Sequence, residues 1–310
     1  MMQEKFKPTL SKLRKLLLGK HLSDGLIFKV IVYFLLVIVG FVFIYPILVM
    51  ISYSFMSLED LINPTVFQVP TQIYFRNYID AFLALDYTNV FFQSMVVTLI
   101  PALLQTFIAS LIGYGFARFE FPLKKLWMSL VVIVYMIPPQ VYLIPRFVLF
   151  NDLGLLNNVG SILIPATFGQ GLNSSIFILI FYQFYKMVPK ALDEAAQIDG
   201  ANRLYIYFKI AIPLSIPSFI TTFLFSFVWQ WNETFQTFIF LGDGWQTLQT
   251  RLAIFVSAAQ GNQVTIIESA QNEAQAMAGN ILIMIPMLIV YFILQRHFIE
   301  GVDKSGITGE

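Results

Sequence analysis

The sequence has no cysteine among its 310 residues, only two histidines, and charged residues make up 12% of it. Without cysteine, the chain forms no disulfide, thiolate metal site or cysteine nucleophile. The histidines, His21 and His297, lie outside the apolar runs or at the very end of one, so we expect no metal site. The sequence also lacks the GxxxxGK[ST] pattern that cradles phosphates, so we expect no ATP site of that type.

Apolar residues dominate what is present. Hydrophobic residues make up 57% of the chain and the mean hydropathy is +0.73. They are gathered in runs of about 20 residues, the length that crosses a bilayer as a helix. The sequence therefore predicts an all-α polytopic membrane protein with six transmembrane helices. These lie at about 27–52, 93–117, 126–149, 160–185, 212–241 and 280–298.

Lysine and arginine are distributed unevenly between the two sides of these spans. With the N-terminus inside, only Arg76, Arg146 and Arg251 of the 19 basic residues fall on the outer side. Cytoplasmic loops carry the excess of basic residues, so we expect both termini in the cytoplasm. The basic segment from Lys5 to Lys20 resembles a secretory signal, but the apolar run after it is too long for one and is read as a retained span. We expect residues 1–26 to be a cytoplasmic arm that touches anionic lipid and binds no nucleic acid.

The segment after the fourth predicted span, about 187–211, lies on the basic side and contains signals for a helix-turn-helix hairpin. Pro189 is suited to the first helical position, and Asp193 and Glu194 follow where the helix dipole favours acid. Gly200 can adopt the left-handed conformation that ends a helix. A second helical run is predicted from about Asn202 to Lys209, leading into the fifth span.

This segment resembles the EAA signature of the permease subunits of ABC importers. The resemblance rests on Glu194-Ala195-Ala196, on Gly200, and on Ile210-Ala211-Ile212-Pro213, where Ile212 replaces the usual leucine. It implies a cytoplasmic coupling-helix hairpin that docks on a separate ATPase, which would hold the ATP and magnesium. The residues expected at the coupling contact are Asp193, Glu194, Ala195, Ala196, Asp199 and Gly200.

Other segments are similar to the carbohydrate-uptake branch of these permeases. They are Arg76-Asn77-Tyr78, Tyr114-Gly115-Phe116-Ala117-Arg118-Phe119, Ile137-Pro138-Pro139-Gln140, Trp231-Asn232-Glu233, and Gln295-Arg296-His297-Phe298-Ile299-Glu300-Gly301. The resemblance implies a permease domain over 27–299, a cytoplasmic tail at 300–310, a second and distinct permease subunit, two ATPase copies, and an extracytoplasmic binding protein. It also implies a location in the bacterial plasma membrane, the transport of a sugar or oligosaccharide, and the absence of catalytic residues from this chain.

Polar side chains in the fifth predicted span mark a candidate substrate path. An ionisable group inside a span is costly and should face a cavity or a partner. Indoles beside amide and carboxylate groups suit a sugar, whose ring faces stack and whose hydroxyls form hydrogen bonds. The candidates are Trp229, Gln230, Trp231, Asn232, Glu233 and Gln236. Tryptophans of an interfacial belt and polar contacts between helices are the alternative, and for the isolated Gln105, Gln170 and Asn173 helix–helix hydrogen bonding is expected.

Three other functions remain as alternatives. Permeases for peptides, amino acids or glycerol-phosphate-like solutes share the docking motif. A secondary transporter would typically show an inverted repeat and ionisable residues near the midplane, whereas Glu233 is the single candidate here. An intramembrane enzyme would need a catalytic constellation, and no apolar run contains one.

Overall fold

The computed structural model describes residue 17 and residues 25–259 and 266–306, which form helices and turns and contain no strand. The predicted basic arm therefore lies almost wholly outside the described residues, as does the end of the predicted tail, 307–310. The chain divides into two compact units, Met1–Asn77 and Tyr78–Glu310.

The first unit consists of one long apolar helix and a folded segment, up to residue 77, that follows it in the chain. Helix α2 (Leu26–Ser54) exposes nearly all of its apolar side chains, as a lipid-facing span does, and α3 (Leu58–Ile62) follows. Asp60 accepts hydrogen bonds from the backbone and hydroxyl of Thr71 (3.1 and 2.6 Å). The buried side-chain amide of Asn77 donates to the carbonyls of Ser54 and Met56 (3.0 and 2.8 Å), so polar contacts hold residues 54–77 together.

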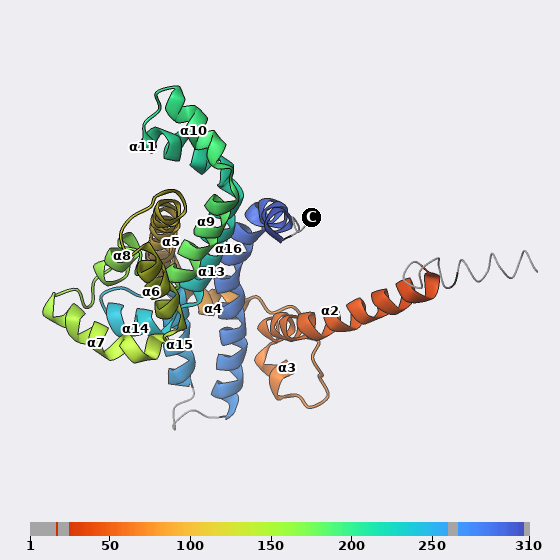
Figure 1. Ribbon diagram of the computed structural model, residues 1–310. Helices are drawn as coiled ribbons and strands as arrows, with labels where there is room; N and C mark the ends of the chain where they lie inside the picture. The colour runs from red at the N-terminus through yellow and green to blue at the C-terminus, as the bar shows by residue number, and fades with distance from the viewer. Residues whose placement is uncertain (1–16, 18–24, 260–265, 307–310) are drawn as a thin grey trace, which may run out of the picture. The chain divides into compact units, whose positions relative to one another are not determined.

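The second unit is a helical bundle built around α5 (Tyr87–Arg118), which packs against α8, α9 and α13, while α16 packs against α13 and α15 (Figure 1). The other helices are α4 (Arg76–Ala84), α6 (Lys124–Met136), α7 (Pro139–Asp152), α8 (Gly160–Thr167), α9 (Ser174–Met187), α10 (Lys190–Ile198), α11 (Arg203–Ile206), α12 (Ile212–Leu214), α13 (Ile216–Asn232), α14 (Phe235–Leu241), α15 (Leu248–Ala259) and α16 (Ile266–Gly306).

Small and polar side chains set the packing of α5. A Cβ on Gly113 would lie 2.6 Å from Cβ of Phe181 and 2.9 Å from the backbone nitrogen of Tyr182, so α5 and α9 approach each other closely there. Such contacts at small residues are a main source of helix association in membranes. Gln105 donates to the hydroxyl of Ser226 on α13 (2.5 Å), which confirms the helix–helix hydrogen bond expected for this glutamine.

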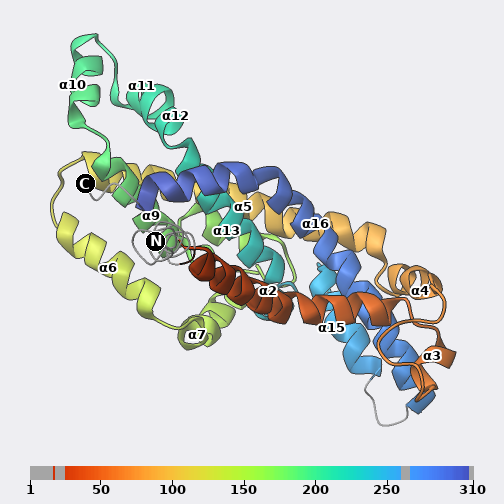
Figure 2. The same cartoon turned by 90° about the vertical axis from the view of Figure 1, so that its right-hand side faces the viewer.

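Two of the predicted spans are bent sharply, and prolines account for both bends. Helices α6 and α7 meet at 100°, where Pro138 and Pro139 remove two successive backbone donors (Figure 2). The helical segment 203–214 meets α13 at 76°, between Pro213 and Pro217. A proline in a helix interior removes one hydrogen bond and clashes with the preceding turn, which kinks or breaks the helix.

The described residues give fewer candidate spans than the six predicted. Three helices, α2, α5 and α16, are long and apolar enough to cross a membrane, and the described residues give up to five spans if each bent pair is one. The predicted fourth span, 160–185, is not one helix, because residues 168–173 separate α8 from α9. Gly169 and Asn173 adopt positive φ in this break. The predicted fifth span is likewise interrupted at Glu233 and Thr234, between α13 and α14.

Candidate functional site

In the segment where the hairpin was predicted, the structure has two short helices, α10 and α11, with a turn at Gly200 between them, and we call this segment the hairpin. Helix α10 begins at Lys190, one residue later than predicted, with Pro189 as its N-cap. Gly200 has φ +85°, its N–H bonds to the carbonyl of Gln197 (3.0 Å), and the N–H of Ala201 bonds to the carbonyl of Ala196 (2.9 Å). This pair of bonds is the Schellman pattern, in which a left-handed residue closes a helix.

The second arm of the hairpin is continuous with the fifth predicted span. The side chain of Asn202 caps α11 by accepting a hydrogen bond from the backbone N–H of Tyr205 (2.7 Å). Beyond α11 the chain forms a wide π-helical turn, Tyr207–Ala211, and then α12. Helical backbone is therefore continuous from Arg203 to Leu214, at the bend before α13.

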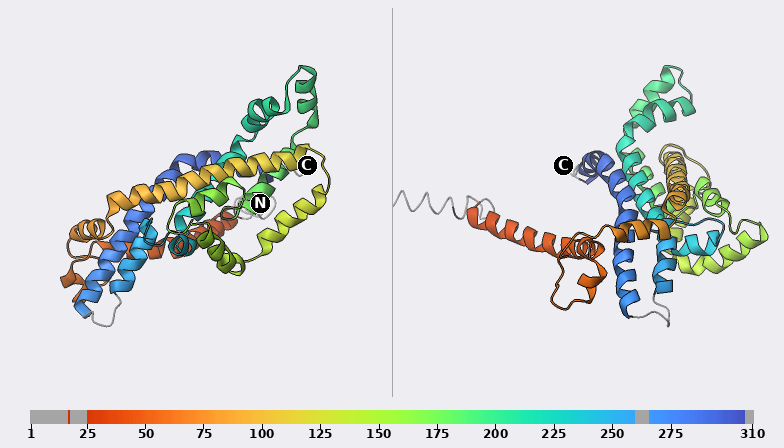
Figure 3. Two further views of the ribbon diagram at one scale, coloured as in Figure 1. Left: turned by 90° about the vertical axis from the view of Figure 1, so that its left-hand side faces the viewer. Right: turned by 180° about the vertical axis from the view of Figure 1, so that it is seen from behind.

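The hairpin projects from the bundle in both views of Figure 3 and is largely exposed. Of the predicted coupling residues, Glu194, Ala195, Asp199 and Gly200 are exposed and Ala196 is half-buried. Two large apolar side chains of the hairpin, Ile198 and Leu204, are 87% and 66% exposed.

Asp193 is the exception, because it is buried and faces the bundle. Its carboxylate lies 3.0 Å from Nε of Arg118 at the end of α5, and the two side chains are 11% and 4% exposed. The guanidinium of Arg203 lies over the ring of Phe119, 5.4 Å from its centroid. These two contacts tie the two arms of the hairpin to the end of α5.

The loop after α5 carries a second, exposed ion pair. Lys124 Nζ lies 2.9 Å from the carboxylate of Glu120 and donates a hydrogen bond to it. That hydrogen bond, with the lysine's charge, lowers the pKa of Glu120 below its usual range. Exposed pairs of this kind contribute little to stability, and this one lies within the loop, so the Arg118–Asp193 pair is the ion pair that links the hairpin to α5.

A hydrogen-bonded cluster continues this attachment into the bundle. The hydroxyl of Tyr185 on α9 lies 2.8 Å from that of Ser110 on α5 and 2.9 Å from that of Ser215, at the bend before α13. Tyr207, on the π-helical turn, donates to Ser110 (3.1 Å). The four side chains are fully buried and connect three bundle segments to the base of the hairpin.

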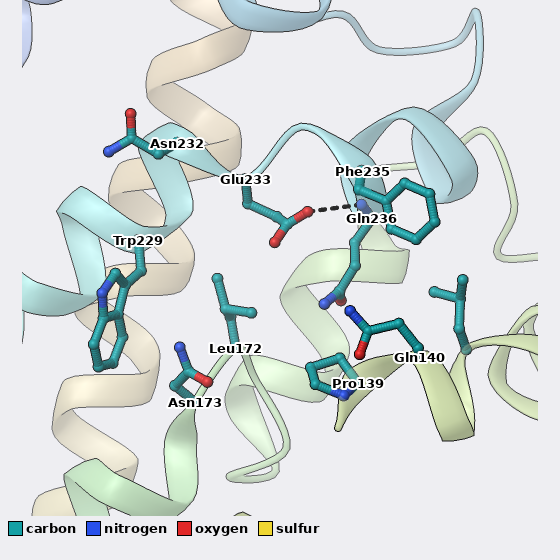
Figure 4. Close-up of a pocket in the computed structure, with 10 residues that line it drawn as sticks. Pro139, Gln140, Leu172, Asn173, Trp229, Asn232, Glu233, Phe235 and Gln236 are labelled. Carbon is teal, nitrogen blue, oxygen red and sulfur yellow. Dashed lines mark hydrogen bonds between the residues drawn. The ribbon is translucent and has the colours of Figure 1, made fainter. Parts of the chain in front are cut away.

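A cavity of about 520 Å³ lies at the other end of α13, and we call it the amide pocket (Figure 4). It is lined by Pro139, Gln140, Leu143, Leu172, Asn173, Trp229, Asn232, Glu233, Phe235 and Gln236. Its volume is in the range of small-molecule sites, about 300–1,000 Å³. Since α13 rises about 1.5 Å per residue, its 17 residues separate the pocket from the hairpin side by roughly 25 Å.

The amide pocket contains four of the six residues predicted for the substrate path. Glu233 is half-buried, and its carboxylate accepts a hydrogen bond from the backbone N–H of Gln236 (2.8 Å), which fixes it at the break between α13 and α14. Trp229 stacks on Phe177 (ring centroids 5.3 Å apart) and lines the cavity. Asn232 and Gln236 complete the four predicted residues that line the cavity.

The other two predicted path residues, Trp231 and Gln230, do not line the amide pocket. Trp231 is 2% exposed and stacks on Phe227 within the core (5.8 Å). It faces a different cavity, between α13, α15 and α16. The reason is the helical periodicity of α13, which turns neighbouring residues to different faces.

Two polar lining residues, Gln140 and Asn173, were not among the predicted path residues. Gln140 lies in the first turn of α7, directly after the 100° bend, and Asn173 directly precedes α9 at φ +56°. Asn173 was assigned to helix–helix hydrogen bonding. The signal that could have found both is their position beside Pro138-Pro139 and Gly169 to Gly171, where a span is interrupted and its backbone must face protein or water.

Comparisons with known proteins identify the family of the chain. Residues 105–304 match the family described as "Binding-protein-dependent transport system inner membrane component". The chain is 28% identical to the polygalacturonan/rhamnogalacturonan transport system permease protein YtcP of Bacillus subtilis over 293 residues, 91% of this chain and 99% of that one. It is 29% identical to the melibiose/raffinose/stachyose import permease protein MelC of the same species, over 85% of this chain and 91% of that one.

A solved structure of a bacterial ABC transporter involved in the import of the acidic polysaccharide alginate has a chain similar to this one. The TM-score is 0.68 at 25% identity, covering 88% of this chain and 96% of that chain. The family match covers well over half of the sequence, and the fold agrees with it. The chain belongs to the family of binding-protein-dependent transport system inner membrane components, the permease subunits of ABC transporters, and is a transport subunit and not an enzyme.

Proposed function

We propose that this chain forms half of the pathway by which an ATP-driven importer carries a sugar or oligosaccharide across the membrane. The observation that carries the proposal is the amide pocket, where an indole, four side-chain amides and a carboxylate converge at the end of α13 opposite the hairpin. Indole faces and amide groups suit the apolar ring faces and the hydroxyls of a saccharide. The relatives named above transport acidic polymers in one case and neutral oligosaccharides in another, which supports the saccharide class without choosing between the two.

The hairpin of α10 and α11 is proposed as the docking element for the ATPase. Its exposed Glu194, Ile198 and Leu204 supply one polar contact and two apolar ones. Its buried contacts, from Asp193 to Arg118 and from Arg203 to Phe119, would pass a movement of the ATPase to α5. A single-cysteine variant at Ile198 tests this, because the chain has no cysteine of its own. Crosslinking to the ATPase is expected from Ile198→Cys and not from Asp152→Cys; the reverse pattern would rule out docking at the hairpin.

The proposed assembly contains two ATPase copies, a second and distinct permease subunit and an extracytoplasmic binding protein. In this chain we propose six spans, with α8 and α9 together forming a broken fourth one, and both termini in the cytoplasm. Labelling with a membrane-impermeant maleimide tests the orientation. Ala191→Cys should react only from the cytoplasmic side and Asp152→Cys only from the outside, and labelling of both from the same side would contradict the topology.

The assembled complex gives the main test of the proposed function. In nanodiscs with its ATPase and binding protein, ATP hydrolysis should be stimulated by saccharides and not by amino acids, peptides or glycerol phosphate. Stimulation by one of those solutes alone would replace the sugar assignment while leaving the docking role in place. Loss of saccharide stimulation in Glu233→Gln, with basal hydrolysis unchanged, would place the amide pocket on the path. An unchanged response would remove it.

A further inference from the structure

A second cavity, of about 600 Å³, lies beside the amide pocket, between α6, α7, α8 and the start of α9. We call it the Arg146 pocket, since Arg146 is the one charged residue that lines it. Its polar lining otherwise consists of neutral groups, namely Tyr135, Tyr142, Gln170, Asn173, Ser174 and Ser175. The two cavities share Pro139 and Asn173, so a solute in one would lie against the wall of the other.

Arg146 is held in an unusual setting for a cation. Its guanidinium carbon lies 5.1 Å from the ring centroid of Phe150 and 5.4 Å from that of Phe240. The side chain is half-buried, and it makes no hydrogen bond or ion pair with any residue of the described part of the chain. The aromatic faces compensate part of the cost of burying the charge, and no residue of the described part of the chain accepts a hydrogen bond from the guanidinium.

A charged side chain within a membrane bundle normally has a partner or a function. Arginine is suited to one kind of partner above others, because its planar fork binds a carboxylate through two parallel hydrogen bonds. The neutral hydroxyls and amides around Arg146 are suited to sugar hydroxyls. An anion that also carries hydroxyl groups therefore fits this cavity better than a neutral solute does.

We propose that Arg146 binds the carboxylate of an acidic saccharide, of the uronate class, as it passes the amide pocket. This inference rests on the proposed saccharide function and narrows it. Arg146 would thus determine the charge of the saccharide that the permease accepts, while the amide pocket binds its neutral hydroxyls.

The test uses the complete complex in liposomes, with binding protein and ATP, and two matched saccharides: an oligogalacturonate and its fully methyl-esterified form. The two differ in charge and share the sugar backbone. Transport efficiency, kcat/KM, is measured for wild type, Arg146→Gln, Arg146→Lys and Arg251→Gln. Arg251 is the control, since it is also predicted on the outer side but bonds to Gln246 (3.2 Å) and lines neither cavity.

Arg146→Gln should lower kcat/KM for the acidic form about 10- to 100-fold, the range for losing a hydrogen bond to a charged group, and leave the ester within about twofold. For the acidic form, kcat/KM of Arg146→Lys should lie between the values of wild type and Arg146→Gln, and kcat/KM of Arg251→Gln should equal that of wild type. An equal loss for both saccharides, the pattern of a structural or lipid-binding arginine, would overturn the proposal. So would wild-type transport of neutral saccharides alone. If no saccharide is transported, the proposed function fails instead.

Discussion

Removing the charge of Asp193 should detach the α10 arm of the hairpin from α5. Asp193 is the only buried residue of α10, and its carboxylate lies 3.0 Å from Arg118. Replacing it with asparagine leaves the arginine, which is 4% exposed, as an uncompensated buried charge. The neighbouring Glu194 is exposed, so Glu194→Gln removes the same charge one residue away as a matched control.

Breaking a buried ion pair from one side costs about 3–5 kcal/mol. Since the Asp193 side chain keeps 11% exposure and lies near the aqueous edge, we take the lower end, about 3 kcal/mol. At about 1.4 kcal/mol per factor of ten, this corresponds to roughly a hundredfold change in local opening. Arg118→Gln should have a similar effect. The double variant should lower the free energy of local opening by less than the sum of the two single effects, and the difference, the interaction free energy, should be about 1–3 kcal/mol.

Hydrogen exchange of the α10 amides, in nanodiscs without the ATPase, measures this opening directly. Protection over Lys190–Ile198 should fall in Asp193→Asn and Arg118→Gln and stay unchanged in Glu194→Gln. With the ATPase bound, Asp193→Asn should also lower substrate-stimulated ATP hydrolysis. The reasoning would be refuted by wild-type protection in Asp193→Asn, or by single effects that add within about 0.5 kcal/mol in the double variant.

Three further predictions follow from other contacts. Gly113→Leu should destabilise the bundle by several kcal/mol, measured by thermal unfolding in detergent, because its Cβ alone would lie 2.6 Å from Phe181; an unchanged melting temperature would contradict the close packing. Ile198→Asp should weaken ATPase binding at least about tenfold in a pull-down titration, while unaltered affinity would place docking elsewhere. Asn173 has φ +56° and lines the amide pocket, so Asn173→Ala should reduce both saccharide transport and stability. If neither transport nor stability falls, Asn173 has no role in the pocket.

The parts of the structure that the sequence could predict are those in which the local pattern decides the conformation. Helices α2, α5 and α16 follow from long apolar runs, although α16 continues well beyond both ends of the predicted sixth span. The hairpin follows from proline, acidic residues and Gly200, each of which acts within one helical turn. The hydropathy average failed at the breaks near residues 137, 170 and 233, because the flanking apolar residues keep the window hydrophobic across a bend.

The candidate site was predicted in part for the same reason. Trp229 and Glu233 were identified from their own segment, whereas Gln140 and Asn173 reach the pocket only because two spans are broken. Trp229 and Trp231 are two residues apart on α13 but point to different faces of the helix, so they line different cavities. Their closeness in the sequence does not reveal this difference. Arg146 entered the sequence analysis as one of three outer basic residues. Its neighbour Phe150 is one turn further along α7, but its second aromatic neighbour, Phe240, lies on α14, far along the chain.

Saccharide uptake into liposomes that contain the complete complex tests the central claim most directly. With binding protein outside and ATP available on the hairpin side, labelled saccharide should accumulate, and omission of ATP, the ATPase or the binding protein should each abolish uptake. Uptake by this chain alone, driven by an ion gradient without ATPase or ATP, would contradict the account and identify a secondary transporter.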